Sequence, residues 1–485
     1  MAGQDAGKDV KISRLLFLDD RNVSRSDNAV IKLGDIKKHS SNPLMREDKA
    51  WEKRFDNFYG NIIFDKQNDL YKCWYSPFIV ANSSAKMSFE DMKNIQYEGH
   101  EFQEMAICYA TSADGLVWDK PELNLVDFNG SKLNNIIFRG PHGGGIFYDK
   151  EDTDNTARYK LLFQGLKTSL SRDGLIWSQH KYLASVKASG NEKITGDTHN
   201  NALWAPTLSK YVAFTRTWAE TDREVVGKQT FLNHKWTRQV SRIESDDFRT
   251  WSNSEVCITC TKWEHQPYAM PVFYHAGVYF GLLAIHDQVS DRVWTELAWS
   301  KDSVKWERVE EGTPFIQCSD NELDYDYGCV YACATPVFLD DEVRIFYGAS
   351  DWLHTSWRNG YLALATLRPD GFAGYEQIDK SLPATIISSI LSFKDCLIKV
   401  TIDMESDGWV IAKLFNDSKE QISASHLTNS CSDEVLFDSR LSDLETGYLE
   451  FEFKNARLYS FCLDYLVMDK QVGFLSNLFK SINRG

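Results

Sequence analysis

One short phrase occurs four times along the chain. It reads SADGLVW at residues 112–118, SRDGLIW at 171–177, SDDFRTW at 245–251 and SKDSVKW at 300–306. A Trp ends each phrase, and successive Trp residues are 59, 74 and 55 positions apart. Self-similarity with a period of this size is typical of an array of supersecondary units, so repetition must dominate the fold.

The segments that lead into each phrase have the pattern of short β-strands. Two runs separated by a polar turn come first, and a third run ends in the phrase; the paired runs are NIIFDKQNDLYKCWY, GIFYDKEDTDNTARYKLLFQG, ALWAPTLSKYVAF, MPVFYHAGVYFGLLAI and TPVFLDDEVRIFYGA. The fifth unit carries a degenerate phrase, RPDGFAGY. Such strands and turns predict one antiparallel sheet per unit. Five sheets predict an all-β fold in which residues 46–380 form a five-bladed β-propeller.

The repeated phrase has a local structural explanation. Its Ser and Asp side chains can hydrogen-bond the backbone of a tight turn, and its Gly supplies a positive φ. Its Trp is large enough to fill the space between neighbouring sheets. We therefore expect the phrase to stabilise the fold and to make no contact with substrate.

The pattern changes after residue 380. The segments CLIKVTIDMESDGWVIAKLFND and TGYLEFEFKNARLYSFCLDYLV alternate as strands but lack the repeated phrase. They predict a β-sandwich over residues 381–485, with a linker near EQIDKSLPATI. Residues 1–45 are predicted to form an extended arm that wraps or caps the first domain.

The charge balance excludes two classes of partner. The chain has 54 Lys and Arg against 69 Asp and Glu, a net charge of −15, and no basic run. We therefore expect no binding to nucleic acid or to a membrane surface. No segment has the length of a signal peptide or a membrane helix, which predicts a cytoplasmic protein, or a secreted one if a leader was removed.

The ten cysteines are scattered through apolar runs, which predicts reduced core residues. Cys257 and Cys260 have the spacing of half a zinc ribbon, but no second pair of this spacing follows. We expect no metal site and no cofactor.

The loops before the innermost strands hold most of the candidate site residues. Arg216 is instead expected on the second strand of the third unit, and Asp351 and His354 in the loop after the fifth unit. The innermost strands start side by side in a propeller, so their preceding loops converge on a central funnel. Cleavage of a glycosidic bond needs an acidic group and an ionised carboxylate there. The catalytic candidates are Asp197, Glu264 and Asp326. The substrate-binding candidates are Asp56, Asn57, His142, His199, Asn200, Arg216, Tyr268, Asp351 and His354.

Each catalytic candidate also has a structural explanation. Asp197, in GDTHNN, can cap its own turn, and Glu264, in KWEHQPY, can be a solvated loop residue. Asp326, in NELDYDYG, lies among aromatic residues that could raise its pKa, or in an acidic surface loop. The sequence leaves these alternatives open.

Several segments resemble a known family. YATSADGLVWDKPEL, GDTHN, VSRIESDDFRTW and the C-terminal ARLYSF make the chain similar to glycoside hydrolases of the invertase, levanase and arabinanase group. The resemblance implies a five-bladed propeller, a sandwich and three carboxylates in the funnel. The matching positions hold Asn57 with Asp56 beside it, then Pro141 or His142, then Asp197 where the family has Glu.

These observations predict an exo-acting glycoside hydrolase that removes a terminal sugar, a furanoside or a modified hexose, from an oligosaccharide. A closed funnel favours chain ends by analogy with the fold. The alternative is a propeller that binds carbohydrate or a protein without turnover. A third hypothesis is a phosphorylase, which would need a cluster of Arg, Lys and His beside one acid. The sequence does not predict the oligomeric state.

Overall fold

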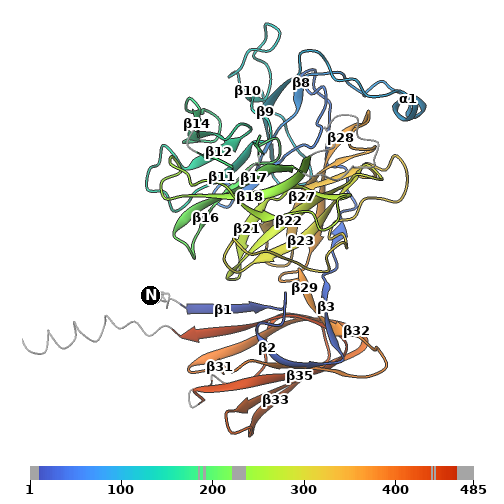
Figure 1. Ribbon diagram of the computed structural model, residues 1–485. Helices are drawn as coiled ribbons and strands as arrows, with labels where there is room; N and C mark the ends of the chain where they lie inside the picture. Colours follow the sequence, from blue (N-terminus) through green and yellow to red (C-terminus); the bar gives the residue numbers. More distant parts are fainter. Residues whose placement is uncertain are drawn as a thin grey trace, which may run out of the picture. The chain divides into compact units, whose positions relative to one another are not determined.

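The computed structural model describes residues 10–183, 186–188, 193–220, 236–437, 441 and 444–466 (Figure 1). These residues form strands and turns, with one short helix, α1 (Phe89–Asn94), so the predicted all-β class is confirmed. The chain divides into two compact units: residues 35–369, here called the repeat unit, and residues 1–34 with 370–485, here called the C-terminal unit. Within the described ranges, no helix is long and apolar enough to cross a membrane.

The repeat unit begins with three separate antiparallel sheets, one for each of the first three predicted units. The first contains β6 (Asn61–Asp65), β7 (Leu70–Tyr75), β9 (Glu104–Ser112) and β10 (Ile136–Arg139), with β8 (Phe78–Val80) at its edge. The second contains β11 (Gly145–Tyr148), β12 (Tyr159–Phe163), β13 (Lys167–Ser171) and β14 (Lys181–Tyr182). The third contains β15 (Lys193–Ile194), β16 (Asn201–Ala205), β17 (Lys210–Glu220), β18 (Trp236–Ser245) and β19 (Glu255–Ile258).

The fourth and fifth predicted units share one larger sheet. Their strands are β20 (His265–Ala269), β21 (Val272–His275), β22 (Val278–Asp287), β23 (Arg292–Ser300), β24 (Glu307–Arg308), β25 (Cys329–Ala332), β26 (Val337–Phe338), β27 (Val343–Ser350) and β28 (Gly360–Leu367). A single parallel pair, Val293 with Cys329, joins β23 to β25. The short strands β4 (Lys37–Lys38) and β5 (Met45–Arg46) pair with β28, so residues from the start of the unit complete its last sheet.

The first strands of successive units lie side by side. Strands β6, β11, β16 and β21 contact one another in that order, and β26 contacts β6. Buried Asn side chains connect neighbouring strands: the Ile146 amide donates to Asn61 Oδ1 at 2.9 Å, and the Val272 amide donates to Asn201 Oδ1 at 2.9 Å. Apolar clusters fill the space between each pair of neighbouring sheets, including the last and the first. The count of five blades stays a prediction.

The repeated phrases form the tight turns that their residues predict. In each one the Asp Oδ1 accepts hydrogen bonds of 2.7 to 2.9 Å from the backbone amides two and three positions later. The Trp rings then pack on the neighbouring sheet. The ring centroids of Trp118 and Phe346 are 5.9 Å apart, and those of Trp306 and Phe214 are 5.5 Å apart. The phrase therefore holds the turn and the interface between sheets, as expected.

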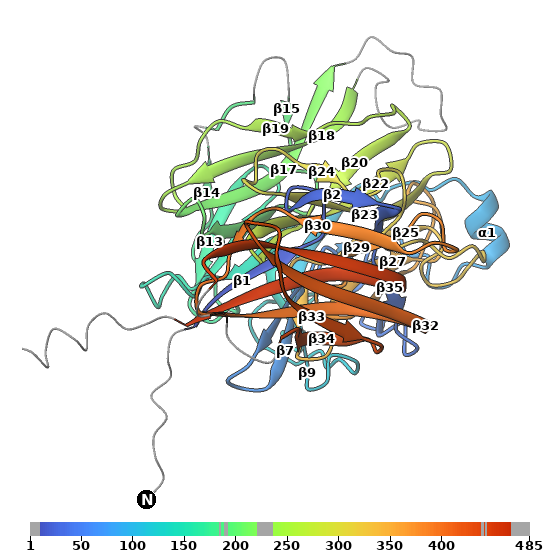
Figure 2. The ribbon, with the colours of Figure 1, turned by 90° about the horizontal axis from the view of Figure 1, so that it is seen from below.

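The C-terminal unit is built on two long strands, β32 (Cys396–Asn416) and β35 (Thr446–Leu466), which pair along most of their length (Figure 2). Strands β29 (Ala373–Gln377), β30 (Ala384–Ser388) and β31 (Leu391–Ser392) pair with β35, while β33 (Gln421–Leu427) and β34 (Cys431–Val435) pair with β32. Alternate side chains of these strands form one apolar core. The β-sandwich stays a prediction.

The arm predicted for residues 1–45 needs a correction. Strand β1 (Val10–Leu16) pairs with β35, β2 (Val23–Asp27) with β30, and β3 (Ala29–Leu33) with β29. Residues 10–33 therefore belong to the sheet of the C-terminal unit, because their unpaired backbone groups complete its edges. Only the short strands β4 and β5 join the repeat unit. The residues before Val10 lie outside the described ranges.

Candidate functional site

A cavity of about 380 Å³ lies where the first strands of the repeat unit begin. The loop before β6 contributes Asp56, the loop before β11 contributes His142, and the loop before β16 contributes Asp197. Strands β17 and β18 of the third sheet add arginine and tryptophan side chains. The cavity thus collects residues that are far apart in the sequence, as the predicted convergence of the loops requires.

Asp197 forms a pair with His142 in the wall of this cavity. Nε2 of His142 lies 2.8 Å from Asp197 Oδ1, and the other ring nitrogen of His142 contacts the sulfur of Met105. Burial opposes ionisation of Asp197, but the hydrogen bond from His142 and the nearby arginines hold its pKa far below its usual value. Asp197 is therefore an ionised carboxylate whose side chain is still 47% exposed.

Asp56 is the second carboxylate of the cavity and is held by two arginines. Its Oδ1 accepts from Nη2 of Arg358 at 2.7 Å and from Nε of Arg54 at 3.2 Å. Burial raises the pKa of Asp56, and the two guanidinium groups lower it by more, so the net shift is downward. Asp56 is thus ionised and fixed in position.

Arg216 and Arg238 enter the cavity from adjacent strands. Both side chains are almost completely buried, and both guanidinium carbons lie over the ring of Tyr268, at 4.2 and 5.0 Å from its centroid. Arg238 also lies 5.0 Å from the ring centroid of Trp218, its partner in the strand register. Burial and the charge of Arg216 lower the pKa of Arg238 to about 10.

A layer of hydrogen-bonded side chains supports the cavity from behind. Asn57 is buried, accepts from Arg358 at 2.9 Å and donates to the Tyr268 hydroxyl at 3.1 Å. His354 itself lines the cavity and links it to this layer, since its Nδ1 lies 2.8 Å from the Tyr331 hydroxyl. Burial keeps the pKa of His354 well below its usual value, and the charge of Arg358 adds to this shift. These contacts fix the orientation of the cavity residues.

Six predicted site residues line the cavity: Asp56, His142, Asp197, Arg216, Tyr268 and His354. Three others lie behind it, because they bond the backbone or the supporting layer. Asn57 belongs to that layer, the amide of Asn200 donates to the carbonyl of Gly143, and His199 contacts Asn61. Their contribution is to position the loops.

The structure does not bring the remaining three candidates to the cavity. Asp326 is buried in an ion pair with Lys38 at 2.6 Å and accepts from Tyr347 at 3.0 Å. Asp351 accepts from the backbone and the side chain of Asn359, so it closes its own loop. Glu264 directly precedes β20, partly exposed and outside the lining. These residues lie apart from the cavity because the polar loops are long and only part of each loop reaches it.

Sequence reasoning missed three arginines of the site, Arg54, Arg238 and Arg358. Arg242, on the same strand as Arg238, donates to Glu244 at 2.9 Å and to Ser303 at 3.1 Å and does not line the cavity. Arg238 and Arg242 point to the same face of one strand, but Arg238 lies opposite Trp218 and Arg242 opposite Phe214. That pairing cannot be read without the register of the hairpin.

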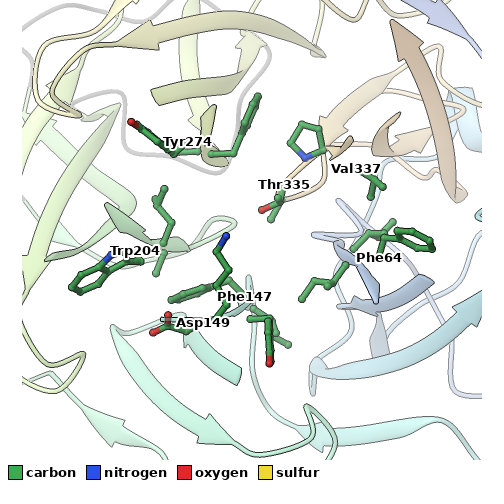
Figure 3. Close-up of a pocket in the computed structure, with 18 of the residues that line it drawn as sticks. Phe64, Phe147, Asp149, Trp204, Tyr274, Thr335 and Val337 are labelled. Atoms are coloured by element: carbon green, nitrogen blue, oxygen red, sulfur yellow. The ribbon is translucent and has the colours of Figure 1, made fainter. Parts of the chain in front are cut away.

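A second, larger cavity of about 760 Å³ lies at the other ends of the same strands (Figure 3). Phe64, Phe147, Trp204 and Tyr274 surround it, one from each of four first strands. Its buried carboxylate, Asp149, is already bound by Tyr211 at 2.7 Å and by a buried lysine. The other charged residues of its lining, Lys66, Lys150 and Glu151, are exposed.

No protein-family model and no curated protein matches the chain. Solved structures are similar in part. A glycosyl hydrolase from Bacteroides ovatus has 14% identity over 70% of this chain and 95% of its own, with a TM-score of 0.44. A β-1,2-mannobiose phosphorylase from Listeria innocua has 14% identity over 69% and 97%, with a TM-score of 0.43.

An N-acetylgalactosamine deacetylase from F. plautii, in complex with blood group B trisaccharide, has 12% identity over 70% of this chain and 96% of its own. Its TM-score is 0.43. The structures similar to this chain thus include glycoside hydrolases and a phosphorylase. The particular resemblance to the invertase, levanase and arabinanase group stays a prediction.

Proposed function

We propose that the repeat unit is a five-bladed propeller whose cavity at the strand starts cleaves the glycosidic bond of a terminal sugar. The observation that carries this proposal is the pair of ionised carboxylates, Asp56 and Asp197, which come from different loops and line one cavity. Two carboxyl groups on either side of a sugar are what glycosidic bond cleavage needs.

The surroundings assign different roles to the two carboxylates. Asp197 is open to the cavity and hydrogen-bonded to His142, so it can take a proton from an attacking water. Asp56 is held between Arg54 and Arg358, so it stays charged and stabilises positive charge that develops at the anomeric carbon. Both groups act in their ionised form, in line with the downward pKa shifts of both, so the departing oxygen takes its proton from water.

The shape of the cavity supports action on a chain end. A volume of about 380 Å³ lies at the lower end of the range for ligand pockets and suits one or two sugar rings. Tyr97 is partly exposed in the lining and offers aromatic surface on which an apolar sugar face can stack. The terminal sugar would occupy the cavity, and the rest of the oligosaccharide would extend outward.

The test is turnover of aryl pyranosides, aryl furanosides and plant and algal oligosaccharides by wild type and by Asp197→Asn. A positioned base contributes about 100- to 10,000-fold, so turnover should fall by at least about 100-fold while the melting temperature is kept. Asp173→Asn, in the repeated phrase of the second sheet, is the matched control and should keep turnover in the folded fraction.

Two results would contradict the proposal. If Asp197→Asn keeps more than about a tenth of the wild-type turnover, Asp197 is not the base. If the wild type turns over none of the glycosides but binds sugars, the protein is a binding module instead. Calorimetric titration with the same sugars separates this second result from an inactive preparation.

A further inference from the structure

The cavity holds more positive than negative charge. Three arginines line it, Arg54, Arg216 and Arg238, against the two carboxylates Asp56 and Asp197. A fourth arginine, Arg358, also binds Asp56 from behind. The described part of the cavity therefore has a surplus of two positive charges when its histidines are neutral.

The surplus is concentrated on Arg216 and Arg238. Arg216 donates to the carbonyl of Tyr268 at 2.6 Å, and its nearest contact with a carboxylate is the 3.9 Å separation from Asp197. Arg238 donates to Gln266 at 3.2 Å and makes no ion pair with any described carboxylate. Nε of each arginine is buried without a hydrogen-bond partner among the described residues.

Such an arrangement is costly in an empty cavity. A buried charge without a counter-charge loses several kcal/mol of hydration, of which a desolvated cation over an aromatic ring regains about 2 kcal/mol or somewhat more. Arg216 and Arg238 also repel each other, since the charge of Arg216 helps to lower the pKa of Arg238. Buried groups held in this way are typical of a site whose ligand supplies the missing charge.

We propose that Arg216 and Arg238 form a subsite for an oxyanion, so that the ligand of this cavity presents a carboxylate or a phosphate group between them. Two planar guanidinium groups recognise such an oxyanion by paired, charge-assisted hydrogen bonds. This inference deepens the proposed function and rests on it, because it names the chemical class of ligand for the same cavity.

The oxyanion has two possible sources. In the first, it is the carboxylate of an acidic sugar, and water cleaves the glycosidic bond. In the second, it is inorganic phosphate: an oxygen of hydrogen phosphate bonds to the anomeric carbon as the glycosidic bond breaks. The departing oxygen takes the proton of the hydrogen phosphate, which gives a sugar phosphate and a free alcohol.

Calorimetric titration of the full chain tests the subsite without turnover. The probes are inorganic phosphate, glucuronate and galacturonate, with glucose and galactose as neutral counterparts. Binding of phosphate identifies the second source, and binding of a uronate in preference to its neutral counterpart identifies the first. If neither anion binds more tightly than the neutral sugars, the proposal is overturned.

Substitutions at Arg238 locate the anion. One charge-assisted hydrogen bond accounts for at least about tenfold in affinity, so Arg238→Gln should weaken anion binding by about tenfold or more. Arg238→Lys should recover part of this loss. Arg242→Gln, on the same strand but paired with Glu244, is the matched control and should bind the anion as wild type does. Equal weakening by Arg238→Gln and by Arg242→Gln would overturn the assignment.

The two proposals fail in different ways. If the proposed catalytic function is wrong, the wild type turns over no glycoside, with or without phosphate, but still binds the anion. If the oxyanion subsite is wrong, the Arg238 substitutions leave anion binding unchanged, and the wild type still turns over glycosides. Melting temperatures of each variant show whether a loss of binding reflects a loss of folding.

Discussion

His199 gives the repeat unit a defined sensitivity to acid. Its side chain is buried, Nε2 lies 3.1 Å from Asn61 Oδ1, and Nδ1 has no partner among the described residues. Burial lowers the pKa of His199 from 6.5 to about 3. Because the unfolded chain keeps the ordinary value, it binds a proton below about pH 6.5 that the folded chain does not bind.

The sign and size of the effect follow from this difference. The stabilisation that comes from a neutral His199 is complete above the unfolded pKa and is lost as the pH falls toward the folded pKa. Between the two pKa values, each pH unit of acidification lowers the free energy of unfolding by about 1.4 kcal/mol. Lowering the pH from 7.5 to 5 should therefore cost the folded state about 2 kcal/mol through this one residue.

The comparison of wild type with His199→Gln isolates this contribution, because Gln can still donate to Asn61 but does not titrate. The variant should lose about 2 kcal/mol less than wild type over the same pH interval. Urea unfolding followed by tryptophan fluorescence measures the repeat unit, since fourteen of the fifteen Trp residues lie in it.

Substitution of the exposed His180 by Gln is the control and should leave the pH dependence of wild type unchanged. If His199→Gln and wild type lose the same free energy on acidification, within about 0.5 kcal/mol, then His199 is not held neutral in the fold. The reasoning about its burial would then be wrong.

Three further predictions concern stability. Lys160→Met should lower the free energy of unfolding by about 3 to 5 kcal/mol, because it leaves Asp149 buried without its cation. In urea unfolding, the double variant Lys160→Met with Asp149→Asn should recover part of this free energy. Trp177 is only partly buried, so Trp177→Ala should lower the free energy of unfolding by about 3 kcal/mol in the same assay, the lower end for large aromatic truncations. Unchanged melting with lost ligand binding would contradict the structural role of the phrase. Burial raises the pKa of Glu47 to about 8, so the folded state binds its proton more tightly and loses stability as the pH rises from about 4.5 to 8. Between pH 5 and pH 9, the wild type should lose about 2 to 4 kcal/mol more of its free energy of unfolding than Glu47→Gln loses. The same pH dependence of the melting temperature in both proteins would refute this.

The repeat and its turns could be predicted from the sequence because their causes are local. The Asp of each phrase bonds amides two and three positions later, and the strands alternate with a period of two, so both signals lie within a few residues. The same signals place the polar loops before the first strands, which is why the sequence could predict that Asp56, His142 and Asp197 lie at one end of these strands.

Only the tertiary structure decided which of the loop residues share a cavity and which strands share a sheet. Asp326 lies in a converging loop but meets Lys38, and Arg238 meets Trp218 through the register of a hairpin. Residues 10–33 join strands more than 300 positions later, as the pairing of Val10 with Leu466 shows. Such partners are fixed by packing and by the satisfaction of distant backbone groups, so a local pattern carries no information about them.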